Sequence, residues 1–400
     1  MSNIKKKLWL ATEYFYPEYS AATGYFLTGI AEKLTEKYNV EVICASPNRK
    51  KGKRIYKEIW NSISIIRLKG QSIDKNNLVL RGIKFILLSI QFFWILLIRT
   101  EKKGNLCVVT NPAPLIILSA VIARFKRMSF TIIVHDIFPE NLVGANIISP
   151  KSLLYRIALP IFNWAYSKAD SLISMGSDMA DVLKCKLPEF QGKVEIIPNW
   201  SDTDLISIGN KIDSEIVSKL GIEKKIIFTF AGNIGRAQGI SGLLNNISGL
   251  SSEQAYFLFF GKGAMLDNVI NSQKLLNNMT YCGFFPRSQR NVFLNATDVA
   301  LIPLAEGMTG LGVPSKTYDY LAAGKALLVI ADGESEISKL VLQENLGWVC
   351  PPDNPEFFRE IVQKIINHPE LLRAIQERAR LIAEKKYSKQ IILDKYLKII

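Results

Sequence analysis

Residues 303–325 read PLAEGMTGLGVPSKTYDYLAAGK, and this stretch decides the fold. The apolar run from Val299 to Leu304 predicts a buried parallel strand, and a helix is expected from near Pro314 to about Gly324. The glycines between the strand and the helix let the backbone approach a ligand without interference from a Cβ atom. This order of strand, glycine-rich loop and helix is typical of a binding loop, although an ordinary structural connection has the same pattern.

Three polar side chains follow on the expected helix. Ser315 and Lys316, on its first turn, offer a hydrogen-bond donor and a cation that suit a phosphate group. Asp319 follows about one turn later on the same face, where it can accept hydrogen bonds from sugar hydroxyls. Solvated surface charges are the alternative interpretation, and this stretch alone leaves both open.

Apolar strands alternate with helical segments along both halves of the chain, which predicts two Rossmann-like, doubly wound parallel-sheet domains. The polar segment 199–210 is the predicted boundary, with domains at 1–205 and 206–380. Two such domains would place the carboxyl ends of both sheets at one cleft, where ligands bind in these folds. The expected strands are 7–12, 40–45, 63–68, 105–110, 129–134, 171–175 and 194–198, then 225–231, 255–260, 279–281, 299–303 and 325–331.

The net charge of +14 is concentrated in the first half. Residues 1–200 carry 28 Lys and Arg against 15 Asp and Glu, whereas residues 201–400 carry 22 against 21. Clusters at 5–7, 49–54, 99–103 and 124–127 make nucleic acid and anionic lipid the two standard partners. The balanced second half and the lack of an aromatic–basic stacking surface argue against nucleic acid.

An apolar segment favours lipid. Residues 85–98 read FILLSIQFFWILLI and lie between Arg81, Lys84 and Arg99. As a helix the segment would be about 21 Å long, short of the roughly 30 Å that a bilayer core requires. A helix in the membrane interface and a buried core helix are the options, and the basic, aromatic flanks favour the interface. Residues 152–165 are a second candidate contact, and we expect a cytoplasmic protein that touches the inner membrane without crossing it.

Two loops of the first half carry candidate site residues. Residues 20–24 (SAATG) precede a helix, so Gly24 can admit an acceptor or a phosphate, or the loop is only a helix cap. After the strand 129–134 come His135, Asp136 and Glu140, a set suited to proton handling or to recognition of sugar hydroxyls. A lone histidine is also often structural. With two histidines and five scattered cysteines, no metal site is expected.

Two loops of the second half suit a nucleotide. Residues 230–239 (FAGNIGRAQG) combine Gly235 and Gly239 with Arg236, a phosphate-cradling pattern that does not fit GxGxxG. A tight turn with a surface arginine is the alternative. Residues 282–287 (CGFFPR) can set backbone groups and the Phe285 ring against a base, or Phe285 packs in the core. A site that is cationic for phosphates and acidic for hydroxyls describes a nucleotide-sugar.

Five motifs in this order resemble glycosyltransferase family 4, whose members have the GT-B fold, and the resemblance covers nearly the whole chain. They are YFYP at 14–17, HDIFPE at 135–140, IPNW at 197–200, AGNIGRAQG at 231–239 and PSKTYDYLAAG at 314–324. The sequence is most similar to bacterial enzymes of O-antigen, capsule or exopolysaccharide assembly, including N-acetyl-L-fucosamine transferases.

The resemblance implies roles for particular residues. Arg236 and Lys316 would neutralise the donor's diphosphate, Asp319 would bind the ribose, and main-chain groups near Phe285 would contact the base. His135 would face the sugar. The family is classed as retaining and needs no metal or other cofactor, and its final helix, here 381–400, commonly packs back on the first domain.

The chain departs from the family pattern at three positions. The second of two glutamates separated by seven residues is Asp319, and the first is Leu311. Leu311 and Gly312 would therefore contact the sugar through backbone groups only. The usual lysine of the phosphate loop is Gln238.

We therefore expect a glycosyltransferase that moves a sugar, such as an N-acetyl amino sugar, from a UDP-sugar to a polyprenyl-diphosphate-linked saccharide at an anionic membrane surface. Two alternatives stay open. One is a non-hydrolysing nucleotide-sugar epimerase of similar fold, and the other is a non-catalytic nucleotide- or sugar-binding protein.

Overall fold

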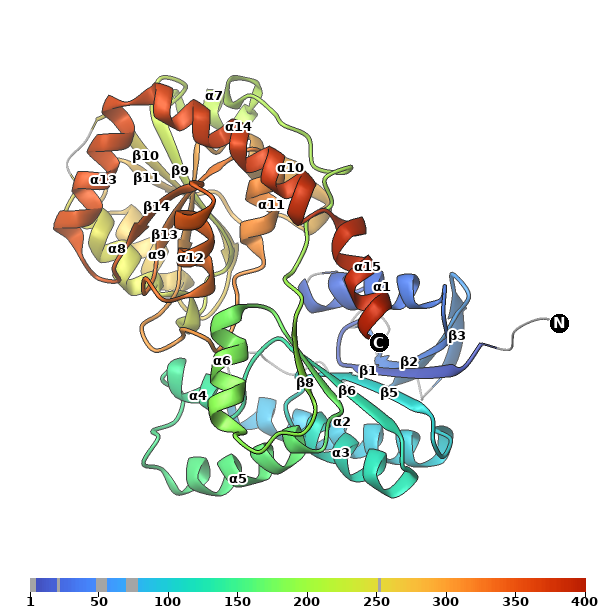
Figure 1. The fold of residues 1–400 in the computed structure, drawn as a ribbon. Helices are drawn as coiled ribbons and strands as arrows, with labels where there is room; N and C mark the ends of the chain where they lie inside the picture. Colours follow the sequence, from blue (N-terminus) through green and yellow to red (C-terminus); the bar gives the residue numbers. More distant parts are fainter. Residues whose placement is uncertain (1–4, 20–21, 48–55, 70–77, 251–252) are drawn as a thin grey trace. The chain divides into compact units, whose positions relative to one another are not determined.

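The computed structural model describes residues 5–19, 22–47, 56–69, 78–250 and 253–400, with the side chains of 78–82 and 84 excepted. The chain folds into two compact units (Figure 1). Unit 1 comprises Met1–Leu142, Ile148–Pro198 and Leu393–Ile400, and unit 2 comprises Val143–Ile147 and Asn199–Ile392. The basic cluster at 49–54 and the loop residues Ser20 and Ala21 lie outside the described residues.

Unit 1 is built on an eight-stranded sheet in the order β3-β4-β2-β1-β5-β6-β7-β8. Its central strands are nearly continuous apolar runs, because a parallel sheet is covered on both faces. The strands are β1 (Lys7–Thr12), β2 (Asn39–Ala45), β3 (Tyr56–Trp60), β4 (Ile63–Leu68), β5 (Asn105–Val109), β6 (Ser129–Val134), β7 (Ser171–Ser174) and β8 (Lys193–Ile196).

One strand of unit 1 departs from the predicted parallel sheet. β3 pairs antiparallel with β4, from Tyr56 opposite Arg67 to Trp60 opposite Ile63. It lies at the edge of the sheet, and the side chain of Ile59 is 78% exposed. The alternating, partly charged sequence YKEIW gave no buried-strand signal, since only one face of an edge strand is covered.

Three helices of unit 1 lie side by side, namely α2 (Leu78–Arg99), α3 (Pro114–Lys126) and α5 (Leu153–Ser167) (Figure 1). Ser152 caps the start of α5 by accepting a hydrogen bond from the Tyr155 N–H at 3.2 Å. The other helices are α1 (Ala22–Leu34), α4 (Glu140–Gly144) and α6 (Ser177–Lys186). Within the described residues, no helix combines the length and apolarity needed to cross a bilayer.

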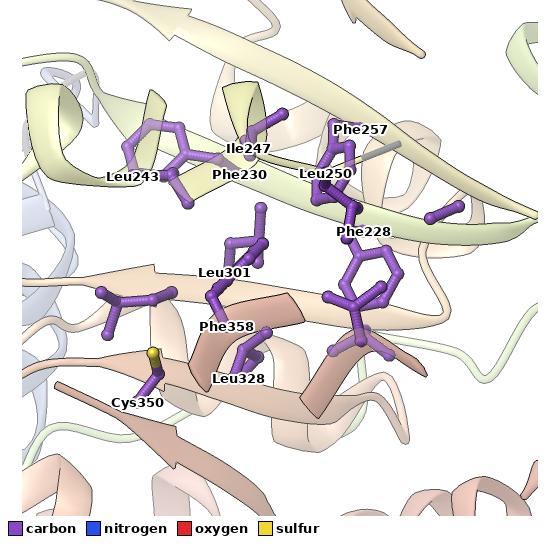
Figure 2. Close-up of a cluster of buried hydrophobic side chains, with 14 of the residues drawn as sticks. Phe228, Phe230, Leu243, Ile247, Leu250, Phe257, Leu301, Leu328, Cys350 and Phe358 are labelled. Carbon is purple, nitrogen blue, oxygen red and sulfur yellow. The ribbon is translucent and has the colours of Figure 1, made fainter. Parts of the chain in front are cut away.

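Unit 2 contains a six-stranded parallel sheet in the order β11-β10-β9-β12-β13-β14. Aromatic side chains of adjacent strands stack in its core, as Phe228 does on Phe257 with ring centroids 5.2 Å apart (Figure 2). The strands are β9 (Ile226–Asn233), β10 (Ala255–Lys262), β11 (Met279–Tyr281), β12 (Val299–Pro303), β13 (Ala326–Ile330) and β14 (Gly347–Cys350). β14 was not predicted; it lies at the edge of the sheet, and three of its four residues are only half-buried.

Eight α-helices surround this sheet, with short 3-10 helices at Lys211–Asp213, Arg236–Gln238 and Arg287–Gln289. Helix α13 begins with Pro355 after Asn354, whose side chain accepts a hydrogen bond from Phe357 N–H. The helices are α7 (Glu215–Leu220), α8 (Ile240–Ser248), α9 (Leu266–Gln273), α10 (Arg290–Asn295), α11 (Lys316–Ala322), α12 (Glu336–Gln343), α13 (Pro355–Asn367) and α14 (Pro369–Lys386).

The last helix, α15 (Lys389–Ile399), supplies its final residues to unit 1. Asp394 forms an ion pair with Lys33 of α1 at 2.8 Å, and the Tyr38 hydroxyl donates to the carbonyl of Ile400 at 2.5 Å. Tyr396 is almost fully buried. Leu393–Ile400 thus packs on unit 1 by charge pairing and by burial of an aromatic ring.

Candidate active site

The loops that follow β9 and β12 meet at the carboxyl edge of the unit 2 sheet. The Ala305 N–H donates to the Ala237 carbonyl at 3.1 Å, which ties the two loops together. Gly239 has a φ of +59°, and a Cβ atom there would lie 2.9 Å from the carbonyl of Leu304. Only glycine fits both this backbone conformation and this close approach.

Lys316 is the cation at the centre of this edge. Its Nζ atom lies 3.5 Å from the centroid of the Phe230 ring, at the end of β9. This atom is shielded from solvent and has no hydrogen-bond partner among the described residues. Burial lowers the pKa of Lys316 to about 7. Its aliphatic chain lies next to Gly232, where a Cβ atom would be 3.7 Å from the Lys316 Cδ.

Arg236 lies in the loop that follows β9, on the 3-10 helix Arg236–Gln238. Its side chain is exposed and pairs with no carboxylate that the structure describes. Gln238, which replaces the family's lysine, accepts a hydrogen bond from the Asn233 side chain at 3.1 Å. A Cβ atom at Gly235 would be 2.6 Å from both of these amide side chains. The loop is thus held by neutral groups, and its guanidinium remains available.

Asp319 is buried and already has partners. Its Oδ1 accepts from the Ser201 hydroxyl at 3.1 Å and from Arg287 Nη2 at 3.2 Å. The Arg287 guanidinium is also 3.2 Å from the other carboxylate oxygen. The sequence predicted neither contact, since Ser201 is 118 positions and Arg287 is 32 positions from Asp319. Ser201 and Arg287 thus hold the Asp319 carboxylate in place.

Phe285 packs inward. Its ring lies against that of Phe260 at 5.7 Å in an edge-to-face arrangement. Its neighbour Phe284 is 45% exposed, and Lys262 Nζ lies 4.0 Å from the centroid of the Phe284 ring. Of the two phenylalanines, Phe284 offers more accessible ring surface, whereas Phe285 can supply main-chain groups.

The remaining predicted donor residues of unit 2 lie between β12 and α11. Leu311 has a buried side chain, and its N–H donates to the Met308 carbonyl at 3.0 Å. Gly312 and Ser315 are half-buried. Ser315 directly precedes α11, which starts at Lys316, and makes no side-chain capping bond.

Gly24 lies elsewhere, because it belongs to unit 1 and falls within the first turn of α1 instead of in a loop. Its missing Cβ atom makes room for the carbonyl of Glu18. The glycine thus has a local packing reason, and its predicted role toward a donor stays a prediction.

The other three predicted residues of the first half, His135, Asp136 and Glu140, follow the carboxyl end of β6. The His135 N–H and the Asp136 N–H both donate to the Thr110 hydroxyl at 3.1 Å. The Nε2 atom of His135 is shielded and has no partner among the described residues. Burial lowers the pKa of His135 to about 4, so its imidazole is neutral at pH 7.

The two carboxylates that follow His135 have different partners, a neutral amide for Asp136 and a lysine for Glu140. Burial raises the pKa of Asp136 to about 6, although a 2.8 Å hydrogen bond from Asn141 opposes the rise. Glu140 forms an ion pair with Lys186 at 2.5 Å, and the Lys186 side chain is only 4% exposed. The sequence gave no signal for Lys186, the last residue of α6. Its charge neutralises Glu140.

Comparison with known proteins defines the class. Anabaena Alr3699/HepE, solved in complex with UDP-glucose, superposes with a TM-score of 0.69 at 14% identity over 98% of each chain. The probable glycosyltransferase WbjE of Pseudomonas aeruginosa is 33% identical over 325 residues, which cover 81% of this chain and 80% of WbjE. The putative colanic acid biosynthesis glycosyl transferase WcaI of Escherichia coli (strain K12) is 28% identical over 219 residues, 51% of this chain and 50% of WcaI.

The two parallel-sheet units and these similarities define a glycosyltransferase of the GT-B fold. Residues 213–382, which carry Arg236, Lys316 and Asp319, match the family Glycosyl transferases group 1. The chain belongs to this family, which confirms the resemblance found in the motifs.

Proposed function

We propose that the protein transfers a sugar from a UDP-sugar to a lipid-linked saccharide during assembly of a bacterial surface polysaccharide. The observation that carries the proposal is the unpartnered ammonium of Lys316, at a sheet edge that also presents the unpaired Arg236, both within the part of the chain that the structure describes. A buried cation without an acceptor is costly, and a diphosphate would provide the missing acceptors.

These two cations suit the chemistry of glycosyl transfer. When the bond from the anomeric carbon to the donor phosphate breaks, negative charge develops on the leaving diphosphate. Arg236 and Lys316 would interact more strongly with that charge than with the intact donor, and so would lower the barrier. We propose retention of configuration without a metal ion, as the family resemblance implies.

Asp319 and the loop 282–287 would fix the nucleoside. The Asp319 carboxylate, held by Ser201 and Arg287, would accept from ribose hydroxyls, and main-chain groups near Phe285 would contact the base. The complex of HepE with UDP-glucose supports a UDP-sugar as donor. An N-acetyl amino sugar is the transferred group that we propose.

In unit 1, His135 would approach the sugar. Because its imidazole is neutral at pH 7, it would exchange hydrogen bonds with a hydroxyl instead of supplying a positive charge. Asp136 sits beside it, and Glu140 keeps its buried pairing with Lys186. These roles follow from position and remain proposals.

The acceptor would be held on a membrane, and α2, α3 and α5 provide the surface for it. The sequences of these helices contain no Asp or Glu. Trp94, Phe125 and Leu153 are between 56% and 73% exposed. Large apolar side chains that gather on one surface in this way mark a site of interaction with a protein or a membrane. We define the apolar face as the exposed side chains Ile83, Ile86, Leu87, Ile90, Trp94, Ile98, Val121, Phe125, Leu153, Leu154, Ile157, Ile161 and Trp164.

Charge around the apolar face selects the kind of membrane. Arg99, Arg124, Arg127, Lys151 and Arg156 are exposed on or beside these helices. An apolar helix surface with basic flanks binds the interface of anionic lipid. We therefore propose peripheral attachment to the anionic inner membrane. The similarity to WcaI, a putative transferase of colanic acid biosynthesis, supports a role in polysaccharide assembly, and membership of a transferase family argues against the epimerase alternative.

A transfer assay tests the proposal. Purified protein is incubated with radiolabelled UDP-N-acetyl amino sugars and membranes that contain polyprenyl-diphosphate-linked saccharide. We expect label to move into the organic-extractable lipid, and Lys316→Met to abolish the transfer while Lys364→Met, an exposed lysine of α13, keeps it. Turnover of the donor without any acceptor would instead indicate an epimerase or hydrolase.

A further inference from the structure

A hollow of about 580 Å³ lies in unit 1 at the amino ends of β7 and β8. This edge of the parallel sheet is the opposite one from His135, which follows the carboxyl end of β6. Four segments form the walls: the end of α3, the turn from α5 to β7, the segment that leads into β8, and the end of α15. None of the residues assigned to the active site lines it.

Four cations and two carboxylates line the hollow. The cations are Arg124, Lys168, Lys193 and Lys398, and the carboxylates are Asp170 and Glu195. One carboxylate is already engaged, because Asp170 Oδ2 accepts from the Phe130 N–H at 2.8 Å.

The four cations have no acidic partner among the residues that the structure describes. Some other lysines of the chain have an acidic partner: Lys33 pairs with Asp394 at 2.8 Å, and Lys211 pairs with Asp298 at 2.6 Å. Four positive charges around one concavity, against two carboxylates among the lining residues, leave a net positive charge that raises the local concentration of anions.

The floor of the hollow is preformed. The Lys193 N–H donates to the Asp170 carbonyl at 2.9 Å. A Cβ atom at Gly192 would lie 2.6 Å from the same carbonyl and 2.9 Å from that of Ala169. The glycine therefore lets two backbone segments pack directly together. Lysine and arginine side chains project from a hydrogen-bonded frame, so that a ligand need not order the loops.

We infer that this hollow binds a phosphate-bearing anion. Ammonium and guanidinium groups form charge-assisted hydrogen bonds with phosphate oxygens, and the volume is within the range of small-molecule sites, larger than one phosphate needs. Helices α3 and α5 line the hollow with their last residues and carry Phe125 and Trp164 of the apolar face. An anionic phospholipid headgroup is therefore the expected source, and that assignment rests on the membrane contact of the proposed function.

The experiment compares two triple variants of the full chain with equal changes in charge. The hollow variant is Lys168→Gln/Lys193→Gln/Lys398→Gln. The control variant is Lys57→Gln/Lys184→Gln/Lys395→Gln, three exposed lysines of unit 1 outside the hollow. Lys395 shares α15 with Lys398, so the pair controls for effects on that helix. Thermal unfolding verifies that both variants fold.

Binding is measured by co-sedimentation with phosphatidylcholine vesicles that contain about a third phosphatidylglycerol. Each basic residue near an anionic surface contributes about 1 kcal/mol of binding free energy, which is roughly a fivefold change in affinity. The hollow variant lacks three such residues and should lose on the order of 100-fold in affinity. The control variant should stay within about threefold of the wild type. Equal losses in both variants, or no loss in either, would exclude the lipid headgroup as the ligand, and the site itself is rejected if the soluble phosphates of the second arm also fail to distinguish the hollow variant from the wild type.

A second arm identifies the source of the phosphate. Glycerol 3-phosphate and inorganic phosphate are titrated without lipid by calorimetry. If the wild type binds one of these two phosphates, and the hollow variant loses that binding but still binds vesicles like the wild type, the site is kept and is assigned to a soluble phosphate. Titration of UDP separates this inference from the proposed function: the hollow variant should bind UDP like the wild type, and a wild type that fails to bind UDP rejects the donor site alone.

Discussion

The ammonium of Lys316 lies 3.5 Å from the centroid of the Phe230 ring and is shielded from solvent. The ring face stabilises the cation in part, while burial lowers the pKa of Lys316 to about 7. Lys316 is thus a cation of reduced basicity at the edge of the sheet, and under the proposed function a diphosphate would stabilise its protonated form. In the proposed donor site, a nucleotide would supply the acceptor that this cation lacks among the described residues.

UDP binding should therefore depend on pH. A bound diphosphate favours protonated Lys316, so its pKa is higher in the complex than in the free protein. Affinity is full below about pH 7 and falls as the pH rises above it, by up to tenfold per unit until the pKa of the complex is reached. Calorimetry between pH 7 and 9 in buffers of different ionisation enthalpy should show proton uptake. The variant Lys316→Arg keeps its charge and should show neither effect; a wild type without proton uptake would contradict this account.

Gly239 should tolerate substitution less than a glycine of the same conformation elsewhere. Both Gly239 and Gly221 have positive φ, +59° and +64°, but a Cβ atom at Gly221 meets nothing within 4 Å. Gly221→Ala should cost about 1 kcal/mol for the left-handed conformation alone. Gly239→Ala adds a clash with the backbone of Leu304, so it should cost at least about 2 kcal/mol more and weaken UDP binding. Equal shifts in urea midpoint would show that the loop contact is unimportant.

His135 should make unit 1 sensitive to acid. Its pKa is about 4 in the folded protein, below the ordinary value of 6.5, so the unfolded chain binds the proton first as the pH falls. The stability contribution is fully present above about pH 6.5 and is lost toward pH 4, an effect of about 3 kcal/mol. The urea midpoint of His135→Gln should fall less over this range than that of the wild type. Replacement of the exposed His368 by Gln should leave the wild-type dependence unchanged.

The Glu140–Lys186 pair should be structural. Lys186→Met leaves the Glu140 carboxylate partly buried without its counter-ion, which should cost about 3 kcal/mol. The double variant with Glu140→Gln removes the isolated charge and should recover most of that loss. If Glu140 serves only as the partner of Lys186, the double variant keeps sugar transfer. A folded double variant without transfer would show that Glu140 takes part in the reaction.

The sequence predicted the buried part of the fold well. β12 and β13 are apolar runs in the parallel sheet of unit 2, so their composition alone identifies them. β3 and β14 were missed, and both are edge strands whose residues are only partly buried. The alternation of strands and helices then sufficed to predict two doubly wound sheets.

Candidate residues were predictable where a local loop motif contains them, whereas their contacts with distant residues were not. Lys316 and Asp319 could be found because both belong to one loop and helix. The link from Asp319 to Ser201 spans 118 positions, and that from Glu140 to Lys186 spans 46. Such pairs depend on tertiary packing, for which a single sequence contains no local pattern.

The most direct test of the central claim is the affinity for UDP, measured by calorimetry at pH 7 for the wild type, Arg236→Ala and Lys316→Met. Matched changes of the exposed Arg373 (to Ala) and Lys364 (to Met) in the same unit serve as controls. A hydrogen bond to a charged group contributes about 1.5–3 kcal/mol, so each site variant should lose roughly 10- to 100-fold in affinity while the controls match the wild type. Affinities of both site variants within about twofold of the wild type would contradict a diphosphate site at this sheet edge.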